Sequence, residues 1–130
     1  MKQFEKNCVL NKDLADYTSW KIGGPADIFF MPNSRSDLSH FLGEYDDDVV
    51  WLGNGTNVLV RDGGIRGAVI STRKSFNEIE LIDKTSCKVE AGVSCFELAM
   101  YATKNNFGPA AFFSGIPGSI GGALVMNAGC

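Results

Sequence analysis

The chain has 130 residues, 45% of them hydrophobic, and 12 Lys and Arg against 15 Asp and Glu leave a formal net charge of −3. This mild acidity, without a cluster of basic residues, argues against nucleic-acid binding. No apolar run reaches the roughly 18 residues of a membrane span, and the N-terminal segment lacks the apolar core of a secretory signal. We therefore expect one folded cytoplasmic chain, large enough for a single core.

The first half of the sequence predicts strands alternating with a helix. Short runs rich in Val, Ile and Phe predict buried strands at Asp27–Met31, Val49–Leu52, Val58–Val60 and Ala68–Ser71. The segment from Ser34 to Tyr45 opens with Ser and Asp and places Leu38, Phe41 and Leu42 at helical spacing, which predicts a short amphipathic helix. A strand, a helix and a strand in succession indicate a right-handed crossover with a parallel pair.

The second half has a different pattern. Two strand-like runs, Asn77–Asp83 and Cys87–Ala91, predict a hairpin. Ser94 and Glu97 then form a Ser-x-x-Glu capping box, which predicts the start of a helix. The apolar face predicted for this helix consists of Phe96, Ala99, Met100 and Phe107, and Gly108-Pro109 supplies its stop. The remaining stretch, Ala110–Cys130, is nearly free of charge and needs cover from other structure.

A glycine-rich loop follows the second predicted strand. It consists of Gly53, Asn54, Gly55, Thr56 and Asn57. Glycines allow positive φ angles and a close approach of the backbone to a ligand, and successive amides with polar side chains suit a pyrophosphate. The loop is neither a dinucleotide-binding Gly-x-Gly-x-x-Gly fingerprint nor a P-loop. Taken alone, the loop is better explained as an ordinary Gly- and Asn-rich turn between two strands.

A second glycine-rich segment runs from Ser114 to Ala123. Its glycine spacing fits backbone packed flat against a planar or phosphorylated ligand, with the amides of Gly118 and Ser119 as donors at a helix start. Tight packing between elements is the alternative. No hydrolase triad is indicated, because the single histidine, His40, lies far from both serines and neither serine stands in Gly-x-Ser-x-Gly.

No metal site is predicted. His40 has no Cys or carboxylate at a ligand interval and is expected on the helix surface, and Asp46–Asp48 are expected to form a solvated turn. The cysteines, which contain no Cys-x-x-Cys pair, are expected to be free thiols. They are Cys8, Cys87, Cys95 and Cys130.

Three segments together resemble a known family. In order and spacing, Thr18–Asp27, Leu52–Val60 and Phe113–Gly129 are similar to the FAD-binding part of the UDP-N-acetylenolpyruvoylglucosamine reductases, also called UDP-N-acetylmuramate dehydrogenases. The resemblance implies an α+β fold of the vanillyl-alcohol-oxidase (PCMH) type with two small subdomains. The expected subdomains are residues 1–74 and an incomplete 75–130, with the break near Arg73 to Asn77 and the substrate-binding domain absent.

The resemblance also implies the cofactor site. By it, Gly53, Asn54, Gly55, Thr56 and Asn57 cradle the FAD pyrophosphate. Ile116, Pro117, Gly118, Ser119, Gly122 and Ala123 line the flavin and the rest of the cofactor. The family's catalytic arginine, serine and glutamate lie beyond this chain, so no catalytic residue is assigned within it.

The implied function is that of an FAD-dependent oxidoreductase in peptidoglycan synthesis, and hence in cell wall biogenesis, cell shape and cell division. For the complete enzyme the resemblance implies that NADPH reduces FAD and that a hydride then passes to the enolpyruvyl double bond of the UDP-sugar to give UDP-N-acetylmuramate. We expect this chain to be a truncated fragment, inactive alone, that meets the UDP-sugar only through the missing domain. Its apolar C-terminal tail is expected to dock on that domain or on a second chain.

Two other hypotheses stay open from the sequence. One is a stand-alone, non-catalytic module that binds FAD or a nucleotide. The other is an interaction protein in which the stretch Ala110–Cys130 docks on a partner, because exposed apolar patches mark interfaces. The FAD affinity of the isolated chain distinguishes these hypotheses, and the sequence leaves the oligomeric state undetermined.

Overall fold

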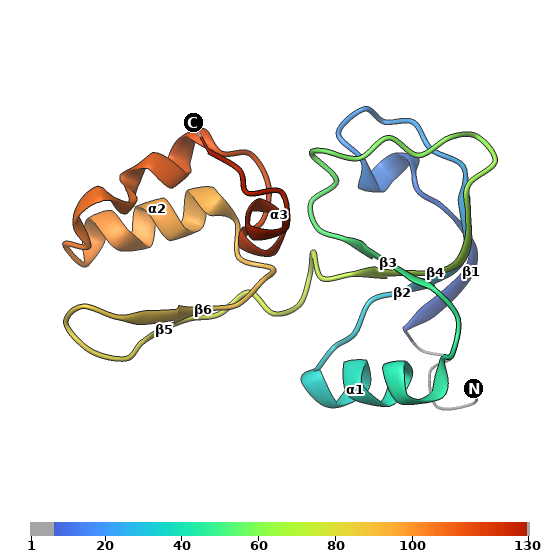
Figure 1. Ribbon diagram of the computed structural model, residues 1–130, viewed down its shortest axis with the longest axis horizontal. Coiled ribbons are helices and arrows are strands. Elements are labelled where there is room, and N and C mark those ends of the chain that lie inside the picture. Colours follow the sequence, from blue (N-terminus) through green and yellow to red (C-terminus); the bar gives the residue numbers. More distant parts are fainter. Residues whose placement is uncertain (1–6, 130) are drawn as a thin grey trace. The chain divides into compact units, whose positions relative to one another are not determined.

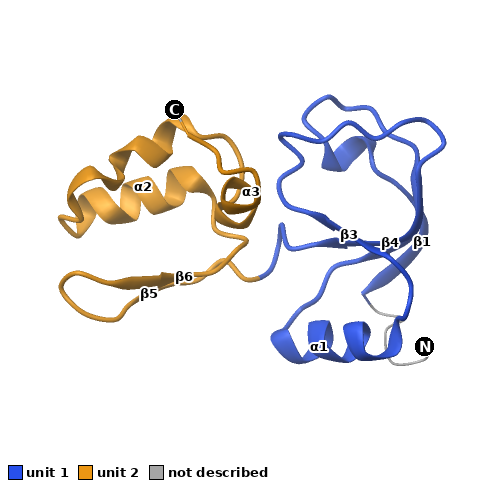
Figure 2. Cartoon of the chain, viewed as in Figure 1, with its two compact units in different colours: residues 1–75 blue, residues 76–130 orange. Residues whose placement is uncertain are grey.

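The structure, a computed structural model, describes residues 7–129. The chain divides into two compact units, residues 1–75 and 76–130 (Figure 2). Each unit has a hydrophobic core of its own. That the two halves serve as the subdomains of an FAD site remains a prediction.

The first unit is built on a four-stranded mixed sheet (Figure 1). In spatial order its strands are β1 (Cys8–Asp13), β2 (Pro25–Phe30), β4 (Ile65–Ser71) and β3 (Val49–Leu52). Strand β1 is antiparallel to β2, whereas β2 and β3 both run parallel to β4. The sheet therefore presents the carboxyl ends of three strands at one edge.

Each face of this sheet carries a buried apolar cluster, as the alternation of side chains along a strand allows. On one face Phe30, Ala68 and Ile70 pack against Phe41 of helix α1 (Arg35–Glu44). The rings of Phe30 and Phe41 stack with centroids 4.4 Å apart. A second cluster contains Phe29 and three other strand residues, Ala26, Leu52 and Val69, together with Leu14 and Val60 from the loops.

Helix α1 confirms the expectation from sequence. The Ser34 hydroxyl accepts a hydrogen bond from the Asp37 amide at 3.0 Å, which satisfies an amide that the first turn leaves without a helical partner. Phe41 is buried and Leu38 half-buried. Leu42, expected on the same apolar face, is instead exposed.

Two strand expectations need correction, and one strand was missed. Val58–Val60 is not a strand; its apolar character arises because Val60 is buried in the core cluster of Phe29 and Val58 packs against that cluster. Strands β2 and β3 are parallel but are not neighbours, because β4 lies between them. Strand β1 was not expected, and its mostly exposed side chains explain why no apolar pattern marked it.

The second unit combines a hairpin with helices. Strands β5 (Ile79–Leu81) and β6 (Cys87–Val89) pair antiparallel, which confirms the expected hairpin in shorter form. After them come α2 (Cys95–Lys104), a 3-10 helix η2 (Gly108–Gly115) and the short helix α3 (Ile120–Val125). The core consists of Val93, Cys95, Leu98, Ile116 and Ile120.

The buried face of α2 differs from the expected one. Leu98, Ala99 and Ala102 are buried, together with Cys95 at the helix start, whereas Phe96 and Met100 are 59% and 57% exposed. Both faces carry apolar residues, so periodicity alone left two choices. The small side chains of the alanines allow α2 to pack closely on its neighbours, and this decides the orientation.

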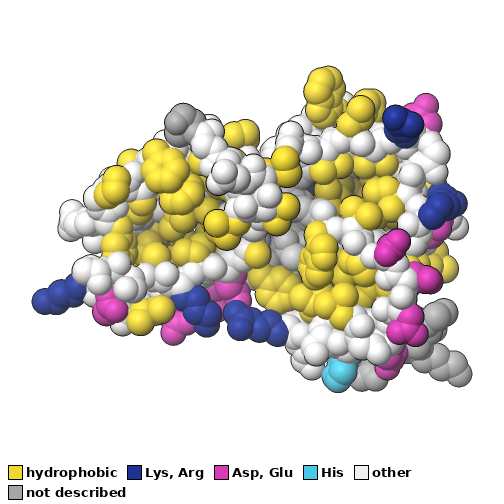
Figure 3. Space-filling view, viewed as in Figure 1, with side chains coloured by type: hydrophobic (Ala, Val, Ile, Leu, Met, Phe, Trp, Pro, Cys, Tyr) yellow, Lys and Arg dark blue, Asp and Glu magenta, His cyan; other side chains and the backbone are white. Residues whose placement is uncertain are grey.

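Large apolar side chains remain exposed on both units (Figure 3). In the first unit they include Trp20, Trp51 and Leu59, and in the second Leu124, Val125 and Met126. Within residues 7–129 no helix is long and apolar enough to cross a membrane.

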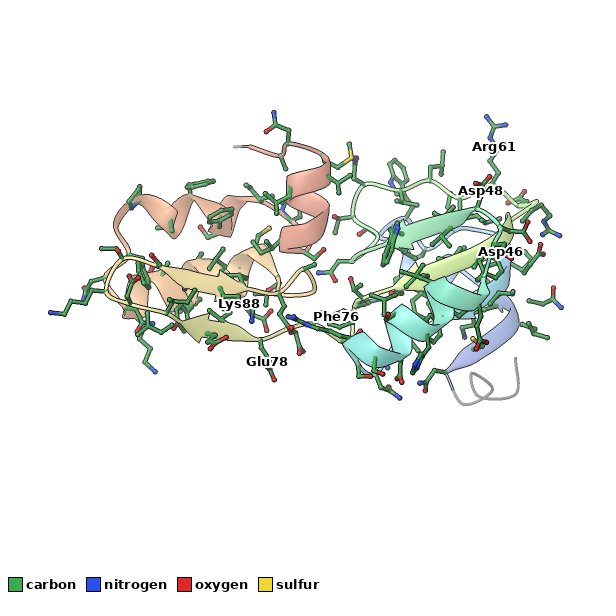
Figure 4. All side chains as sticks on the ribbon, turned by 60° about the horizontal axis from the view of Figure 1, so that its bottom comes forward. Asp46, Asp48, Arg61, Phe76, Glu78 and Lys88 are labelled. Carbon is green, nitrogen blue, oxygen red and sulfur yellow. The ribbon has the colours of Figure 1, made fainter. Side chains whose placement is uncertain are left out.

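The single histidine and the acidic run before β3 lie on the surface, as the sequence predicted. His40 is exposed, as are Asp46 and Asp48, which Figure 4 labels near the connection between α1 and β3. In the described part of the chain no cluster of His, Cys, Asp and Glu could hold a metal ion. The described cysteines, Cys8, Cys87 and Cys95, are free thiols, and Cys130 lies outside the described residues.

Candidate functional site

The loop Gly53–Asn57 lies at the carboxyl edge of the sheet in the first unit. It follows β3 directly, and the turn Thr72–Ser75 follows the neighbouring parallel strand β4. The Thr72 amide donates to the Leu52 carbonyl at 3.4 Å, which joins the two connections. Ligands of open sheets with parallel strands bind at such carboxyl edges.

Position 55 is where this loop requires a glycine. Its φ of +67° lies in the left-handed region, and an added Cβ would collide with the Tyr17 carbonyl. The Ser19 amide donates to the Gly55 carbonyl at 2.9 Å. The loop therefore rests, backbone against backbone, on the segment Ala15–Ser19.

Several amides of this loop point to no protein acceptor. Within residues 7–129, the amides of Gly53, Asn54, Gly55 and Asn57 make no hydrogen bond. Gly55 is buried, and buried backbone amides are nearly always paired. A left-handed residue within a run of amides forms a concave nest for an anion. The loop thus fits a pyrophosphate group.

The motif Thr18–Asp27 overlaps this support at Thr18 and Ser19 and is held by close backbone contacts of its own. Thr18 is buried, and its hydroxyl donates to the Ile22 carbonyl at 2.8 Å, closing the turn. The Gly24 amide donates to the Arg61 carbonyl at 3.0 Å, and a Cβ on Gly24 would collide with the Asp62 carbonyl. Arg61, labelled in Figure 4, has an exposed side chain. The role of this motif in the structure is close backbone packing.

The second glycine segment belongs to the second unit, where it pairs with the approach to α2. Three backbone hydrogen bonds hold it: Cys95 to the Gly118 carbonyl at 3.0 Å, Ile120 to Val93 at 2.8 Å and Gly121 to Ala91 at 2.9 Å. Tight packing, the alternative weighed from sequence, is therefore real for Gly121. An added Cβ there would lie 2.9 Å from the Cβ of Ala91.

The amides just before α3 are different. Those of Gly118 and Ser119 donate to no group among the described residues, and Gly118 has a φ of +116°. The Ser119 hydroxyl caps α3 by accepting from the Gly122 amide at 3.3 Å. The side chain of Ile116 lies in the core, Pro117 is exposed, and Gly122 and Ala123 are half-buried. Gly118 and Ser119 are thus the donors that this segment offers a ligand.

The start of α2, which holds this segment, is stabilised by the expected capping box. The Glu97 amide donates to the Ser94 hydroxyl at 3.1 Å, and the Glu97 carboxylate accepts from the Ser94 hydroxyl at 2.6 Å and from its amide at 2.9 Å. These hydrogen bonds lower the pKa of Glu97. Burial, by contrast, raises the pKa of the Cys95 thiol next to it, so that this cysteine is a neutral core residue.

We expect Ser94→Ala to destabilise the second unit by about 1 kcal/mol at pH 7, because the cap is lost. A carboxyl with a lowered folded pKa stabilises above its unfolded pKa of about 4.3 and loses that contribution as pH falls through the folded value. The cost of Ser94→Ala should therefore shrink at about pH 3. Urea unfolding followed by circular dichroism at both pH values measures the loss of unfolding free energy. Ser39→Ala, an exposed serine inside α1, is the control, and an equal cost at both pH values would contradict the role given to Glu97.

Glycine-rich loops with unpaired amides, carried by two mixed α/β units, are features of a nucleotide-cofactor fold. Residues 26–130 match the family described as "FAD binding domain", and the chain belongs to this family. Its fold is the expected PCMH type of FAD-binding fold.

Two relatives of this chain share the same name. The chain is 45% identical over 124 residues to UDP-N-acetylenolpyruvoylglucosamine reductase of Legionella pneumophila (strain Paris), covering 94% of this chain and 41% of the relative. It is 48% identical over 118 residues to the enzyme of the same name from Nitrosococcus oceani, covering 89% of this chain and 40% of the relative. These matches confirm the resemblance seen in the three motifs.

A comparison with solved structures agrees with the sequence comparison. The chain is similar to the crystal structure of UDP-N-acetylenolpyruvylglucosamine reductase (MurB) from Thermus caldophilus, with a TM-score of 0.71 and 33% sequence identity. The match covers 95% of this chain and 42% of that one. The chain thus spans about two fifths of the length of the relatives it matches.

Proposed function

We propose that these 130 residues are the FAD-binding region of an NADPH-dependent reductase that converts UDP-N-acetylglucosamine enolpyruvate to UDP-N-acetylmuramate in cytoplasmic peptidoglycan synthesis. The names of the relatives and the family match support this proposal. FAD, when bound, supplies hydride-transfer chemistry, and the protein contributes binding and orientation.

The observation that carries the proposal is the set of unpaired amides in the first glycine loop. Four amides of the loop Gly53–Asn57 lack an acceptor among the described residues, and the loop is held rigid through Gly55. A pyrophosphate would supply the missing acceptors. The polar side chains of Asn54, Thr56 and Asn57 would add donors at its rim.

In the second unit we assign Gly118 and Ser119 as the amide donors to the cofactor. Pro117, Gly122 and Ala123 would line the flavin with small or rigid surfaces. Ile116 would contribute through its backbone, because its side chain is buried in the core. Ser119 retains its role as the helix cap, so its hydroxyl is not proposed as a proton donor.

We further propose that the chain by itself does not catalyse the reduction. No residue within it is assigned to proton transfer, and the UDP-sugar would be bound by other parts of a longer protein. Leu124, Val125 and Met126 are 77%, 85% and 56% exposed. Their exposure favours contact with the part of the relatives that this chain does not match, because contiguous exposed apolar patches mark interfaces.

The test is a titration of the purified chain with FAD, followed by flavin fluorescence and by melting temperature. We expect saturable quenching and a melting point that rises with FAD, because a ligand selective for the folded state stabilises it by about 2.7 kcal/mol at a hundred times Kd. Riboflavin, which lacks the pyrophosphate, is the control ligand and should bind more weakly.

Each outcome separates the candidate functions. Tight, stable FAD binding without any other protein favours a stand-alone cofactor module, whereas weak binding favours a region completed by further chain. Concentration-dependent association with no effect of FAD favours an interaction protein. A cooperative melt that FAD does not change would contradict the flavoprotein proposal.

A further inference from the structure

A basic side chain of the first unit lies beside the loop Gly53–Asn57 and belongs to none of the three sequence motifs. Arg73 stands in the turn Thr72–Ser75, directly after β4. Its backbone amide donates to the Ser71 hydroxyl at 3.4 Å, and the Thr72 amide before it donates to the carbonyl of Leu52, the residue that precedes the glycine loop. The turn and the loop therefore leave the sheet side by side.

The guanidinium of Arg73 reaches the support of the loop. Its Nη1 atom donates to the Asp16 carbonyl at 3.3 Å. Asp16 is followed by Tyr17, whose carbonyl faces Gly55 so closely that no Cβ fits between them. One hydrogen bond uses one of the five N–H donors of an arginine, so the others remain available to an anion.

The same turn holds a polar group without a partner. Ser75 is 9% exposed, and within residues 7–129 its hydroxyl is the buried side-chain atom that finds no hydrogen-bond partner. A buried donor without an acceptor costs about 1–3 kcal/mol. Such a group needs an explanation, and a ligand bound beside the turn would provide one.

The charge of the ligand provides the reason for a cation here. The unpaired amides of the loop Gly53–Asn57 are neutral dipoles, whereas a pyrophosphate group carries two negative charges. Arginine matches phosphate geometry with two parallel N–H donors, and hydrogen bonds between charged groups are about twice as strong as neutral ones.

We propose that Arg73 is a cofactor-binding residue, whose guanidinium pairs with the pyrophosphate of the dinucleotide held by the loop Gly53–Asn57. This inference rests on the proposed FAD-binding function and adds a cation to it. Arg73 positions no reacting atom and acts on affinity alone.

The test compares the FAD affinity of the full 130-residue chain with that of Arg73→Gln, Arg73→Lys and Lys74→Gln. Arg73→Gln should raise Kd about tenfold, equal to about 1.4 kcal/mol. Arg73→Lys should lie between it and the wild type, because lysine keeps the charge but not the paired donors. Lys74→Gln removes the same charge from the adjacent exposed residue and should change Kd less than about twofold.

The salt dependence is a second readout. FAD binding by the wild type should weaken more steeply with added KCl than binding by Arg73→Gln, because the screened attraction is already absent from the variant. Should Arg73→Gln fail to fold, the comparison of wild type with Arg73→Lys and Lys74→Gln still tests the inference.

Different results would overturn the role of Arg73 and the proposed FAD-binding function. Binding of FAD by the wild type with unchanged affinity and salt slope in Arg73→Gln overturns the inference and leaves the proposed function standing. Equal losses in Arg73→Gln and Lys74→Gln also overturn it, because general surface charge then explains the effect. No binding of FAD by the folded wild type overturns both.

Discussion

Replacing Gly55 with alanine should destabilise the first unit by about 3 kcal/mol and abolish FAD binding. The left-handed backbone costs a non-glycine residue about 1–3 kcal/mol, and the collision of the new Cβ with the Tyr17 carbonyl forces the loop away from its support. Trp20 and Trp51 are the two tryptophans of the chain, and both lie in the first unit. Urea unfolding followed by tryptophan fluorescence therefore reports this unit.

A matched glycine provides the control. Gly43 lies in α1, where an added Cβ meets nothing within 4 Å. Gly43→Ala should stabilise the unit by up to about 1 kcal/mol, because alanine has the higher helix propensity. If Gly55→Ala unfolded at the same urea concentration as the wild type, the close contact between the loop and Tyr17 would not hold in solution.

Two adjacent glycines of α3 should respond to alanine with opposite signs. Gly121→Ala should destabilise the second unit by about 2 kcal/mol, because its Cβ would lie 2.9 Å from the Ala91 Cβ and 3.1 Å from the Ala91 carbonyl. Gly122→Ala meets only the Ser119 hydroxyl at 3.4 Å, an ordinary contact, and should gain up to about 1 kcal/mol of helix propensity. Thermal unfolding followed by circular dichroism measures both.

FAD titration of the same pair then separates folding from cofactor binding. Gly122 is among the residues proposed to line the cofactor, so Gly122→Ala should raise the melting point yet weaken FAD binding. A variant that is both more stable and equally tight would remove Gly122 from the proposed site. Destabilisation by Gly122→Ala as large as that by Gly121→Ala would contradict the packing described for α3.

The two glycine segments could be identified from the sequence, but their hydrogen bonding could not. Both glycine segments were identified, and unpaired amides occur in each, in the loop Gly53–Asn57 and at Gly118 and Ser119. The assignment of these residues to FAD remains a proposal. Arg73 was not found, because its position beside the loop depends on the parallel pairing of β3 with β4.

Elements whose stabilising contacts are local could be predicted from the sequence alone. Ser34 and Ser94 specify where α1 and α2 begin, because each cap bonds to an amide three residues along the chain. The hairpin of β5 and β6 is equally local. The family resemblance also came from the sequence, because its motifs keep their order and spacing whatever the tertiary contacts.

The contacts between segments distant in sequence became known from the folded structure. Strand β4 lies between β2 and β3. Phe96 and Met100 are exposed, and Val60 is a buried core residue outside any strand. The Tyr17 carbonyl lies against Gly55. These outcomes depend on the volume and backbone approach of distant partners, which hydrophobic periodicity does not encode.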